Sequence, residues 1–399
     1  MLKTTPFHAR TAVLNQTMLW EHWAGYATAT KYQFSEKVEY YAIRNAVALF
    51  DTSPLFKYRF HGPDAEHFLA GVLARDIRHC PVGRAQYTIW CDDHGYVVED
   101  GVILHVRDDE YWLTVAVPNL RYFQDLAGGY DLEISDISEE YGIVAVQGPQ
   151  AGNVLQQLSQ AVANLRFFGL TETKIAGKAV VISRTGYTGD LGYEIWIRPD
   201  DCLALWDRLM EAGAGYNITP MGLRALSMSR IEAGLLLIDV DFESSRYAWI
   251  DGQKATPLEL SFDWMFRKLK EDDRAFIGRR PLEQEMQNGT SRFKVVGLEV
   301  DWRAFEAAHN DIGLIARKDH APTEEAMYLY DAAGKYTGYV TSFMYSPILK
   351  KHIAIGKVPL AQSQPGSEVQ LEWMVNHKPH YLLSRVVSLP FFNPARKTA

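Results

Sequence analysis

The sequence predicts an α+β fold that ends in a separate unit made of strands alone. Up to about residue 290, segments in which apolar residues alternate are interspersed with segments of helical periodicity and with hairpin turns. Beyond that point the alternating segments are short and turn residues separate them, which is typical of a β-barrel or sandwich. We therefore expect one α+β region over residues 1–289 and a C-terminal β-barrel domain over residues 290–399.

The first region is expected to open with a helix over residues 39–50, where apolar residues recur at helical spacing up to the stop signal in residues 51–54. Strands and helices then alternate along the chain. The expected strands are 55–60, 86–91, 97–106, 111–117, 142–148, 178–184 and 192–199, and the expected helices are 65–73, 119–129, 149–160, 201–213 and 223–234. The C-terminal strands are expected within 294–300, 327–343, 352–358, 368–373 and 381–389.

Composition excludes several classes of protein. The chain has 41 basic and 49 acidic residues and a formal net charge of −8, which argues against a general nucleic-acid binder. Its three cysteines form no CxxC pair, so neither a structural zinc site nor a disulfide framework follows. There is no apolar run long enough for a membrane helix and no apolar core of a signal peptide. We expect a cytoplasmic protein without a membrane partner.

Motifs for the common chemistries are also missing from the sequence. It contains no GxGxxG after a strand and no GxxxxGK[ST], HExxH or GxSxG pattern. Its histidines do not follow a metal-ligand spacing. We therefore expect no metal site, and nothing favours a nucleotide cradle or a covalent mechanism.

Two adjacent acids, Glu99 and Asp100, stand inside an expected apolar strand. Neighbouring strand residues point to opposite faces, so one carboxylate faces the interior or a cleft and the other faces away. A carboxylate in apolar surroundings is costly unless it is paired or functional. The pair is therefore either a hairpin end that faces water or a site that handles protons.

A second feature is the glycine-rich turn that leads into an expected strand, with three glycines in residues 186–192. Tyr187 and Tyr193 offer flat faces that could stack on a heterocycle. Glu194 could accept two parallel hydrogen bonds from an aminopyrimidine edge. In isolation, the same residues are also compatible with a plain hairpin turn that carries surface aromatics.

Segments along nearly the whole chain, in order, resemble the glycine-cleavage T-protein (aminomethyltransferase) superfamily, which includes tetrahydrofolate-dependent demethylases. Each segment alone is weak evidence of relationship, but ten of them in the same order are specific for the superfamily. The matching segments are LKTTPF (2–7), AIRNAVALFDTS (42–53), GPDAEHFL (62–69), GRAQYT (83–88), HGYVVEDGVI (94–103), AVQGPQA (145–151), RTGYTGDLGYEIW (184–196), RIEAGL (230–235), TPLEL (256–260) and FIGRRPL (276–282). Residues 338–358 and 386–392 look like the terminal barrel of that superfamily.

The resemblance implies a three-lobed, ring-like fold around a central channel that binds tetrahydrofolate. It implies that Glu194 binds the pterin edge and that Tyr87 and Tyr187 line the pterin. It places Arg230 near the folate. It also implies that Arg396, or another basic residue of the tail, contacts the folate glutamate.

The sequence departs from the T-protein pattern mainly where the donor would bind. T-protein has two aspartates in place of Glu99 and Asp100 and uses the first as its catalytic acid. Here the first position is a glutamate, one methylene longer, and some demethylase relatives keep only the second acid, so we weight Asp100 at least as strongly as Glu99. Several polar or aromatic residues of the pattern are replaced here, at Pro54, Val117, Leu226 and Ile238. These departures weaken the assignment to the glycine-cleavage step and slightly favour demethylase chemistry.

The resemblance thus predicts an enzyme, a tetrahydrofolate-dependent transferase that moves a methyl or aminomethyl carbon to N5 of tetrahydrofolate. Asp100 or Glu99 would orient the amine or take its proton. Trp20, Trp23 and Tyr26 are expected to enclose a methylated cation or an aromatic ring of a small-molecule donor, with core packing as the alternative. The alternatives are an aminomethyltransferase that acts on a lipoyl carrier protein and a non-enzymatic folate-binding protein.

Overall fold

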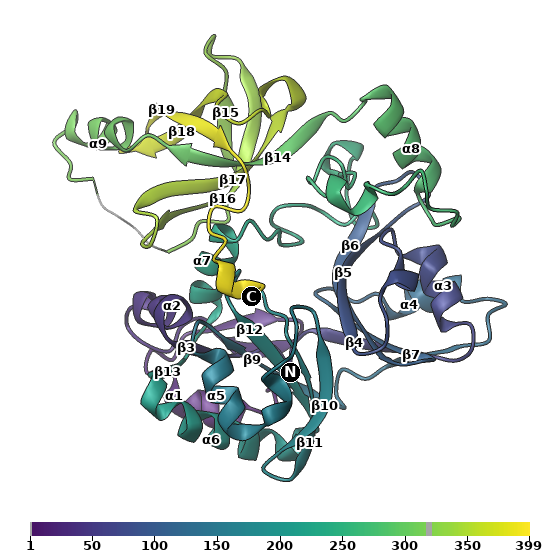
Figure 1. Cartoon of the computed structure of the whole chain (residues 1–399). Helices are drawn as coiled ribbons and strands as arrows, with labels where there is room; N and C mark the ends of the chain where they lie inside the picture. Colours follow the sequence, from purple (N-terminus) through teal and green to yellow (C-terminus); the bar gives the residue numbers. More distant parts are fainter. Residues whose placement is uncertain (1, 317–320) are drawn as a thin grey trace.

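The computed structural model describes residues 2–316 and 321–399, and its sheets form three lobes (Figure 1). The five-stranded sheet is built from a segment inserted between strands of the six-stranded sheet, so these two lobes are interleaved along the chain. The third lobe is a closed six-stranded barrel. The α+β class, the three-lobed arrangement and the C-terminal barrel are confirmed. The domain boundary between residues 289 and 290 stays a prediction.

The six-stranded sheet has the order β10-β11-β12-β9-β3-β13, and its strands pair antiparallel except for β13 with β3. Three helices pack on one face and bury an apolar core that includes Trp206. The strands are β3 (Val47–Asp51), β9 (Gly142–Gln147), β10 (Leu170–Ile175), β11 (Lys178–Ser183), β12 (Gly192–Ile197) and β13 (Ile218–Pro220), and the helices are α1 (His8–Leu14), α5 (Ala151–Leu158) and α6 (Cys202–Gly213).

The helix expected over residues 39–50 is wrong in its second half. Helix α2 spans Glu36–Asn45, and β3 follows at Val47. All five residues of β3 are buried, and the first four, Val47 to Phe50, form a continuous apolar run instead of an alternating one, as in a central strand between β9 and β13. A short apolar run of this kind has no period that separates a central strand from a helix. Helix α7 (Leu223–Glu232) packs against α2 and against the barrel, between two lobes.

The five-stranded sheet has the order β5-β6-β7-β4-β8. Helices α3 (Ala65–Val72) and α4 (Leu120–Leu126) pack against it and bury Trp90 and Phe123 with them. The expected helices over 65–73 and 119–129 are therefore confirmed. The strands are β4 (Phe56–His61), β5 (Arg84–Cys91), β6 (Val97–Arg107), β7 (Glu110–Val115) and β8 (Glu133–Asp136).

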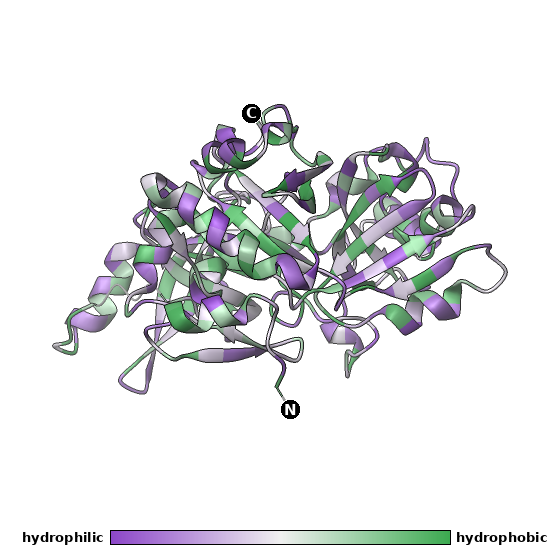
Figure 2. Ribbon diagram, turned by 90° about the horizontal axis from the view of Figure 1, so that it is seen from below, coloured by the Kyte–Doolittle hydropathy of each residue, from purple (hydrophilic) through white to green (hydrophobic). Residues whose placement is uncertain are grey.

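The barrel closes in the order β14-β17-β16-β15-β18-β19. Figure 2 shows hydrophilic and hydrophobic residues alternating along helices and strands, as expected for elements with one buried and one exposed face. The barrel strands are β14 (Phe293–Val300), β15 (Met327–Tyr330), β16 (Tyr336–Ser346), β17 (Lys351–Pro359), β18 (Glu368–Val375) and β19 (Lys378–Val387). The remaining elements are the hairpin β1 (Trp20–Trp23) and β2 (Tyr26–Ala29), α8 (Arg279–Asn288) and α9 (Trp302–Asn310).

A buried ionic cluster joins α2, α7, the glycine-rich turn and the barrel. Arg44 pairs with Glu232 at 2.7 Å and with Asp190 at 3.5 Å, and all three side chains are fully buried. Ser346 of the barrel donates a 2.5 Å hydrogen bond to Glu232, and Arg396 of the C-terminal tail pairs with Asp190. Buried charges are tolerated when each is paired in this way. The cluster therefore fixes the tail and the turn relative to the barrel.

Within residues 2–316 and 321–399, no helix has the length and apolar character needed to cross a membrane. The same residues contain no cluster of three or more side chains suited to holding a metal ion.

Candidate functional site

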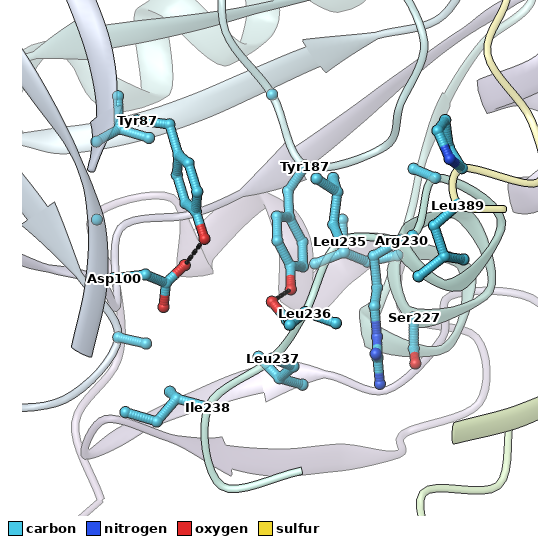
Figure 3. A pocket seen from close by; sticks show the side chains of 18 of the residues that line it. Tyr87, Asp100, Tyr187, Ser227, Arg230, Leu235, Leu236, Leu237, Ile238 and Leu389 are labelled. Atoms are coloured by element: carbon cyan, nitrogen blue, oxygen red, sulfur yellow. Dashed lines mark hydrogen bonds between the residues drawn. The ribbon is translucent and has the colours of Figure 1, made fainter. Parts of the chain in front are cut away.

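Residues of all three lobes line one cavity of about 1760 Å³. The cavity lies between the lobes, and its walls come from segments far apart in the sequence. Figure 3 shows Tyr87 and Asp100 on one side of it and Arg230 and Leu389 on the other. The charged and aromatic lining residues used below are Glu21, Trp23, Tyr87, Asp100, Tyr187, Glu194, Arg224, Arg230, Asp239 and Lys397.

Asp100 and Tyr87 lie together on this wall because they stand on the paired strands β6 and β5. The Tyr87 hydroxyl donates a 2.9 Å hydrogen bond to Oδ2 of Asp100 (Figure 3). Burial raises the pKa of Asp100 to about 6, although the hydrogen bond from Tyr87 acts in the opposite direction. A carboxylate with such a pKa is mostly ionised at neutral pH and can still accept a proton. Asp100 is therefore suited to proton transfer.

Glu99 points away from the cavity, as the alternation along β6 requires. Its side chain is inaccessible to solvent, and it does not line the cavity. Oε1 accepts hydrogen bonds from the backbone N–H groups of Ala116 and Val117 at 2.7 and 2.9 Å, and Oε2 accepts one from the Asn119 amide. The structure therefore places Glu99 behind the wall, where it holds the segment after β7, and it leaves Asp100 as the acid of the pair inside the cavity.

Glu194 stands near the start of β12, on the strand face that looks into the cavity. Burial raises the pKa of its carboxyl group, and a hydrogen bond from the Thr185 hydroxyl opposes that rise. Its neighbour Tyr193 points the other way and is 4% exposed within the core of the six-stranded sheet, so it does not offer a stacking face to the cavity. Tyr187 does line the cavity, and its hydroxyl donates a 2.5 Å hydrogen bond to the carbonyl oxygen of Leu236.

Two predicted basic residues are already engaged by acids. Arg230 lines the cavity but is 1% exposed, and its guanidinium bonds Asp241 at 2.6 Å and Glu324 at 3.0 Å. Arg396 does not line the cavity, because its guanidinium makes a two-pronged ion pair with Asp190 at 2.7 and 2.8 Å. The next residue, Lys397, is the basic residue of the tail that reaches the cavity wall.

Of the three aromatic residues expected at the donor, the structure brings only Trp23 to the cavity. Trp23 stacks on Phe50 with ring centroids 5.9 Å apart. Trp20 packs on the ring of His8 instead, and Tyr26 lies under the ammonium group of Lys3. Alternation along β1 places Trp20 on the face opposite Trp23. Tyr26 is the cross-strand partner of Trp23, and its pairing with residue 3 places it beside Lys3. The expected aromatic enclosure does not form.

Sequence reasoning missed Gln147 and Asp239. Gln147 lines the cavity at the end of β9, and a Cβ at Gly186 or Gly192 would collide with its carboxamide. The two glycines Gly186 and Gly192, close to Glu194, were a signal in the sequence that a side chain from elsewhere packs on this turn. Asp239 lines the cavity in a left-handed conformation with φ of 65°, and no sequence pattern pointed to it.

Comparison with known proteins gives consistent matches over almost the whole chain. Residues 4–270 match the family described as GCVT N-terminal domain, and residues 312–393 match the glycine cleavage T-protein C-terminal barrel domain. A protein of Rubrobacter xylanophilus named aminomethyltransferase is 32% identical over 99% of this chain and 95% of its own length. Another of that name, from Bacillus subtilis, is 32% identical over 90% of this chain and 92% of its own.

The fold is also similar to that of a solved structure. The glycine cleavage system aminomethyltransferase T from Bartonella henselae superposes with a TM-score of 0.83 at 24% sequence identity, over 98% of this chain and 99% of that one. At this level of identity the likeness concerns the fold.

Proposed function

This chain belongs to the glycine cleavage T-protein family, and from that premise we propose that it transfers an aminomethyl carbon from a lipoyl carrier to tetrahydrofolate. It is an enzyme of the tetrahydrofolate-dependent class, with tetrahydrofolate as the acceptor of the one-carbon group. The observation that carries the proposal is that Asp100 and Glu194, from different sheets, line one cavity.

The residues of the cavity fit a folate. Glu194 is an acceptor-only group when ionised, so it matches the donor edge of a pterin, and Tyr187 supplies an aromatic wall. Lys397 provides a positive charge for the anionic tail of the acceptor. A volume of about 1760 Å³ exceeds the roughly 300–1,000 Å³ that is usual for one small ligand. The cavity therefore has room for the acceptor and for the arm that brings the donor.

Tetrahydrofolate supplies the nucleophilic nitrogen, N5, so the protein needs no nucleophile of its own. The chain positions the reactants and manages protons. Glu194 fixes the acceptor in one orientation, which is the kind of alignment that can lower a barrier by several kcal/mol. As the donor carbon bonds to N5 and then to N10, its bonds to the lipoyl sulfur and to its own nitrogen would break, giving the thiol and ammonia. Asp100 would accept the proton that N5 loses and pass it on to a leaving group. Tyr87 keeps the Asp100 carboxylate pointed into the cavity.

An aminomethyl donor is favoured over a methyl donor by the names of the relatives that match this chain almost end to end. The slight preference for demethylase chemistry, which rested on the departures from the T-protein pattern on the donor side, has no support from those relatives. The non-enzymatic alternative is likewise set aside because the family is one of transferases.

A product assay tests the proposal. The protein is mixed with tetrahydrofolate and, separately, with an aminomethyl-loaded lipoyl carrier, a methylated sulfonium, a methylated amine and a methoxy-aromatic compound. Among the four donors, we expect only the aminomethyl-loaded carrier to give methylene-tetrahydrofolate, detected by mass spectrometry, and ammonia. Methyl-tetrahydrofolate with any of the other donors would reject the aminomethyl assignment and name the donor instead.

A further inference from the structure

A chain of buried hydroxyl groups leads from the end of β11 to the Glu194 carboxylate. The hydroxyl oxygens of Ser183 and Thr185 are 2.7 Å apart, and the Thr185 hydroxyl donates to Oε2 of Glu194. A hydroxyl has a single proton to donate. Because Thr185 gives its proton to Glu194, Ser183 is the donor in the first bond. The chain therefore runs in one direction, towards the carboxylate.

Gln147 holds the backbone around Thr185 in place. Its side-chain Nε2 donates to the carbonyl oxygens of Thr185 and Tyr193 at 3.4 and 3.3 Å, so it ties the two arms of the turn together. Gly186 and Gly192 leave the space that the carboxamide occupies, since a Cβ at either position would collide with it. Gln147 is 1% exposed. The position of the Thr185 hydroxyl is thus set by packing as well as by its own bond.

The charged groups around Glu194 are engaged elsewhere. Asp190, in the same turn, is paired with Arg44 and Arg396. The neighbouring Arg184 donates to the carbonyl oxygen of Leu165 at 3.0 Å. Elsewhere in the cavity lining, Asp100 is bonded by Tyr87, Tyr187 is bonded to a backbone carbonyl, and the Lys397 ammonium lies over the Phe167 ring. Thr185 is consequently the side chain on which the state of the Glu194 carboxylate depends.

We propose that Thr185 is a positioning residue for the acceptor, which orients Glu194 for the donor edge of the bound pterin. This inference rests on the proposed function. A carboxylate has about four lone-pair sites, so one bond from Thr185 leaves a free site on each oxygen for two parallel donors. The same bond favours the charged form of Glu194, which burial disfavours. Ser183 and Gln147 support Thr185 and do not themselves touch the carboxylate.

The test is the pH dependence of tetrahydrofolate binding in Thr185→Val, measured by calorimetry from about pH 6 to about pH 9. Without the hydroxyl, more Glu194 is protonated at low pH and cannot accept both bonds. We expect affinity to fall about tenfold or more near pH 6 and the deficit to shrink to about twofold near pH 9. Thr185→Ser keeps the hydroxyl and should bind within about threefold of the native protein.

The matched control is Thr173→Val in β10, which breaks the 3.0 Å pair of the Thr173 hydroxyl with that of Ser159 at the end of α5; Thr173 does not line the cavity. Its affinity should be unchanged. Ser183→Ala is a milder variant in case Thr185→Val does not fold, with an expected loss of about threefold confined to low pH. A loss that is equal at every pH, or no loss at all, would overturn the inference. A native protein that binds no tetrahydrofolate would instead reject the proposed function.

Discussion

Two groups of side chains in the cavity lining differ in how they are held. In the first group, which we call the acceptor side, Asp100, Tyr187 and Glu194 each have a hydrogen bond to a fixed neighbour. In the second group, which we call the donor side, the carboxylates of Glu21 and Asp239 are exposed, and the residues that the structure describes offer them no hydrogen bond or ion pair. A side chain held by its neighbours is ready to bind without losing further entropy, whereas a free one must be ordered by its ligand. We infer that the acceptor site is pre-organised by the fold, whereas the side chains that would contact the donor become ordered only when the donor binds.

The largest effect is expected when the proton acceptor of the acceptor side is removed. Asp100→Asn keeps the shape of the side chain but cannot take a proton, so we expect turnover to fall at least about 100-fold, as is usual for a general base. The native kcat/KM should also fall with a slope of one below about pH 6, because Asp100 protonates there. Steady-state rates across pH check both points.

In Asp100→Asn the fall of kcat/KM below about pH 6 should be absent, while tetrahydrofolate binding and thermal unfolding stay near native. Turnover within threefold of native would remove Asp100 from the mechanism.

Glu99 offers the contrast within the same strand. Glu99→Ala leaves the N–H groups of Ala116, Val117 and Asn119 without their acceptor in a buried place. We expect a loss of about 3 kcal/mol in the free energy of unfolding, measured with urea. Glu99→Gln keeps an oxygen for the two backbone donors, so its stability should fall by only about 1 kcal/mol.

Glu99→Gln should also retain turnover within about threefold of native, in contrast to Asp100→Asn. If the two variants exchanged these outcomes, Glu99 would be the catalytic acid and Asp100 the structural one.

Glu194→Gln tests the acceptor side through the affinity for tetrahydrofolate, without a measurement of turnover. The amide nitrogen is a donor, and it would face the donor edge of the pterin, so we expect tetrahydrofolate affinity to fall at least tenfold, or about 1.4 kcal/mol. Calorimetry at neutral pH measures it. The control is Glu211→Gln on the exposed side of α6, where the carboxylate pairs with Arg208. Equal affinities for the two variants would disconnect Glu194 from the acceptor.

Much of this acceptor side was accessible from the sequence. The acid pair on β6 and the glycine-rich turn stand out against apolar strands, and alternation alone required that Glu99 and Asp100 face opposite ways. Alternation could not say which acid faces inward, because that depends on which face of the five-stranded sheet is covered by α3 and α4. Tertiary packing also decided the end of α2 and the direction of Tyr193.

The donor side was predicted less well for a physical reason. Trp20 and Tyr26 are drawn away by local partners, His8 and Lys3, that a strand pattern does not reveal. The same reason applies once on the acceptor side: Arg396 was expected to contact the folate glutamate, but a buried carboxylate of its own chain, Asp190, pairs with its guanidinium instead. Charge in a sequence shows where a counter-ion is needed and does not show whether the protein or a ligand supplies it.

The smallest effect is expected at Asp239, which tests whether a carboxylate of the donor side attracts the donor. An aminomethyl group carries a basic nitrogen that is cationic at neutral pH, and a free carboxylate in the cavity attracts it. Asp239→Asn tolerates the left-handed backbone at this position. Since the side chain is exposed, we expect KM for the loaded carrier to rise only about threefold to fivefold, with tetrahydrofolate affinity unchanged. The rise should shrink as salt is added.

Arg224 supplies the opposing measurement because it lines the same cavity with a positive charge. Arg224→Gln should lower KM for a cationic donor or leave it unchanged, while the exposed control Asp251→Asn should have no effect. If KM rose in Arg224→Gln and stayed constant in Asp239→Asn, the group recognised there would be an anion. The donor side would then be selected by Arg224, and the aminomethyl nitrogen would have to be held by Asp100 alone, within the acceptor side. The two sides of the cavity would no longer divide the work between them.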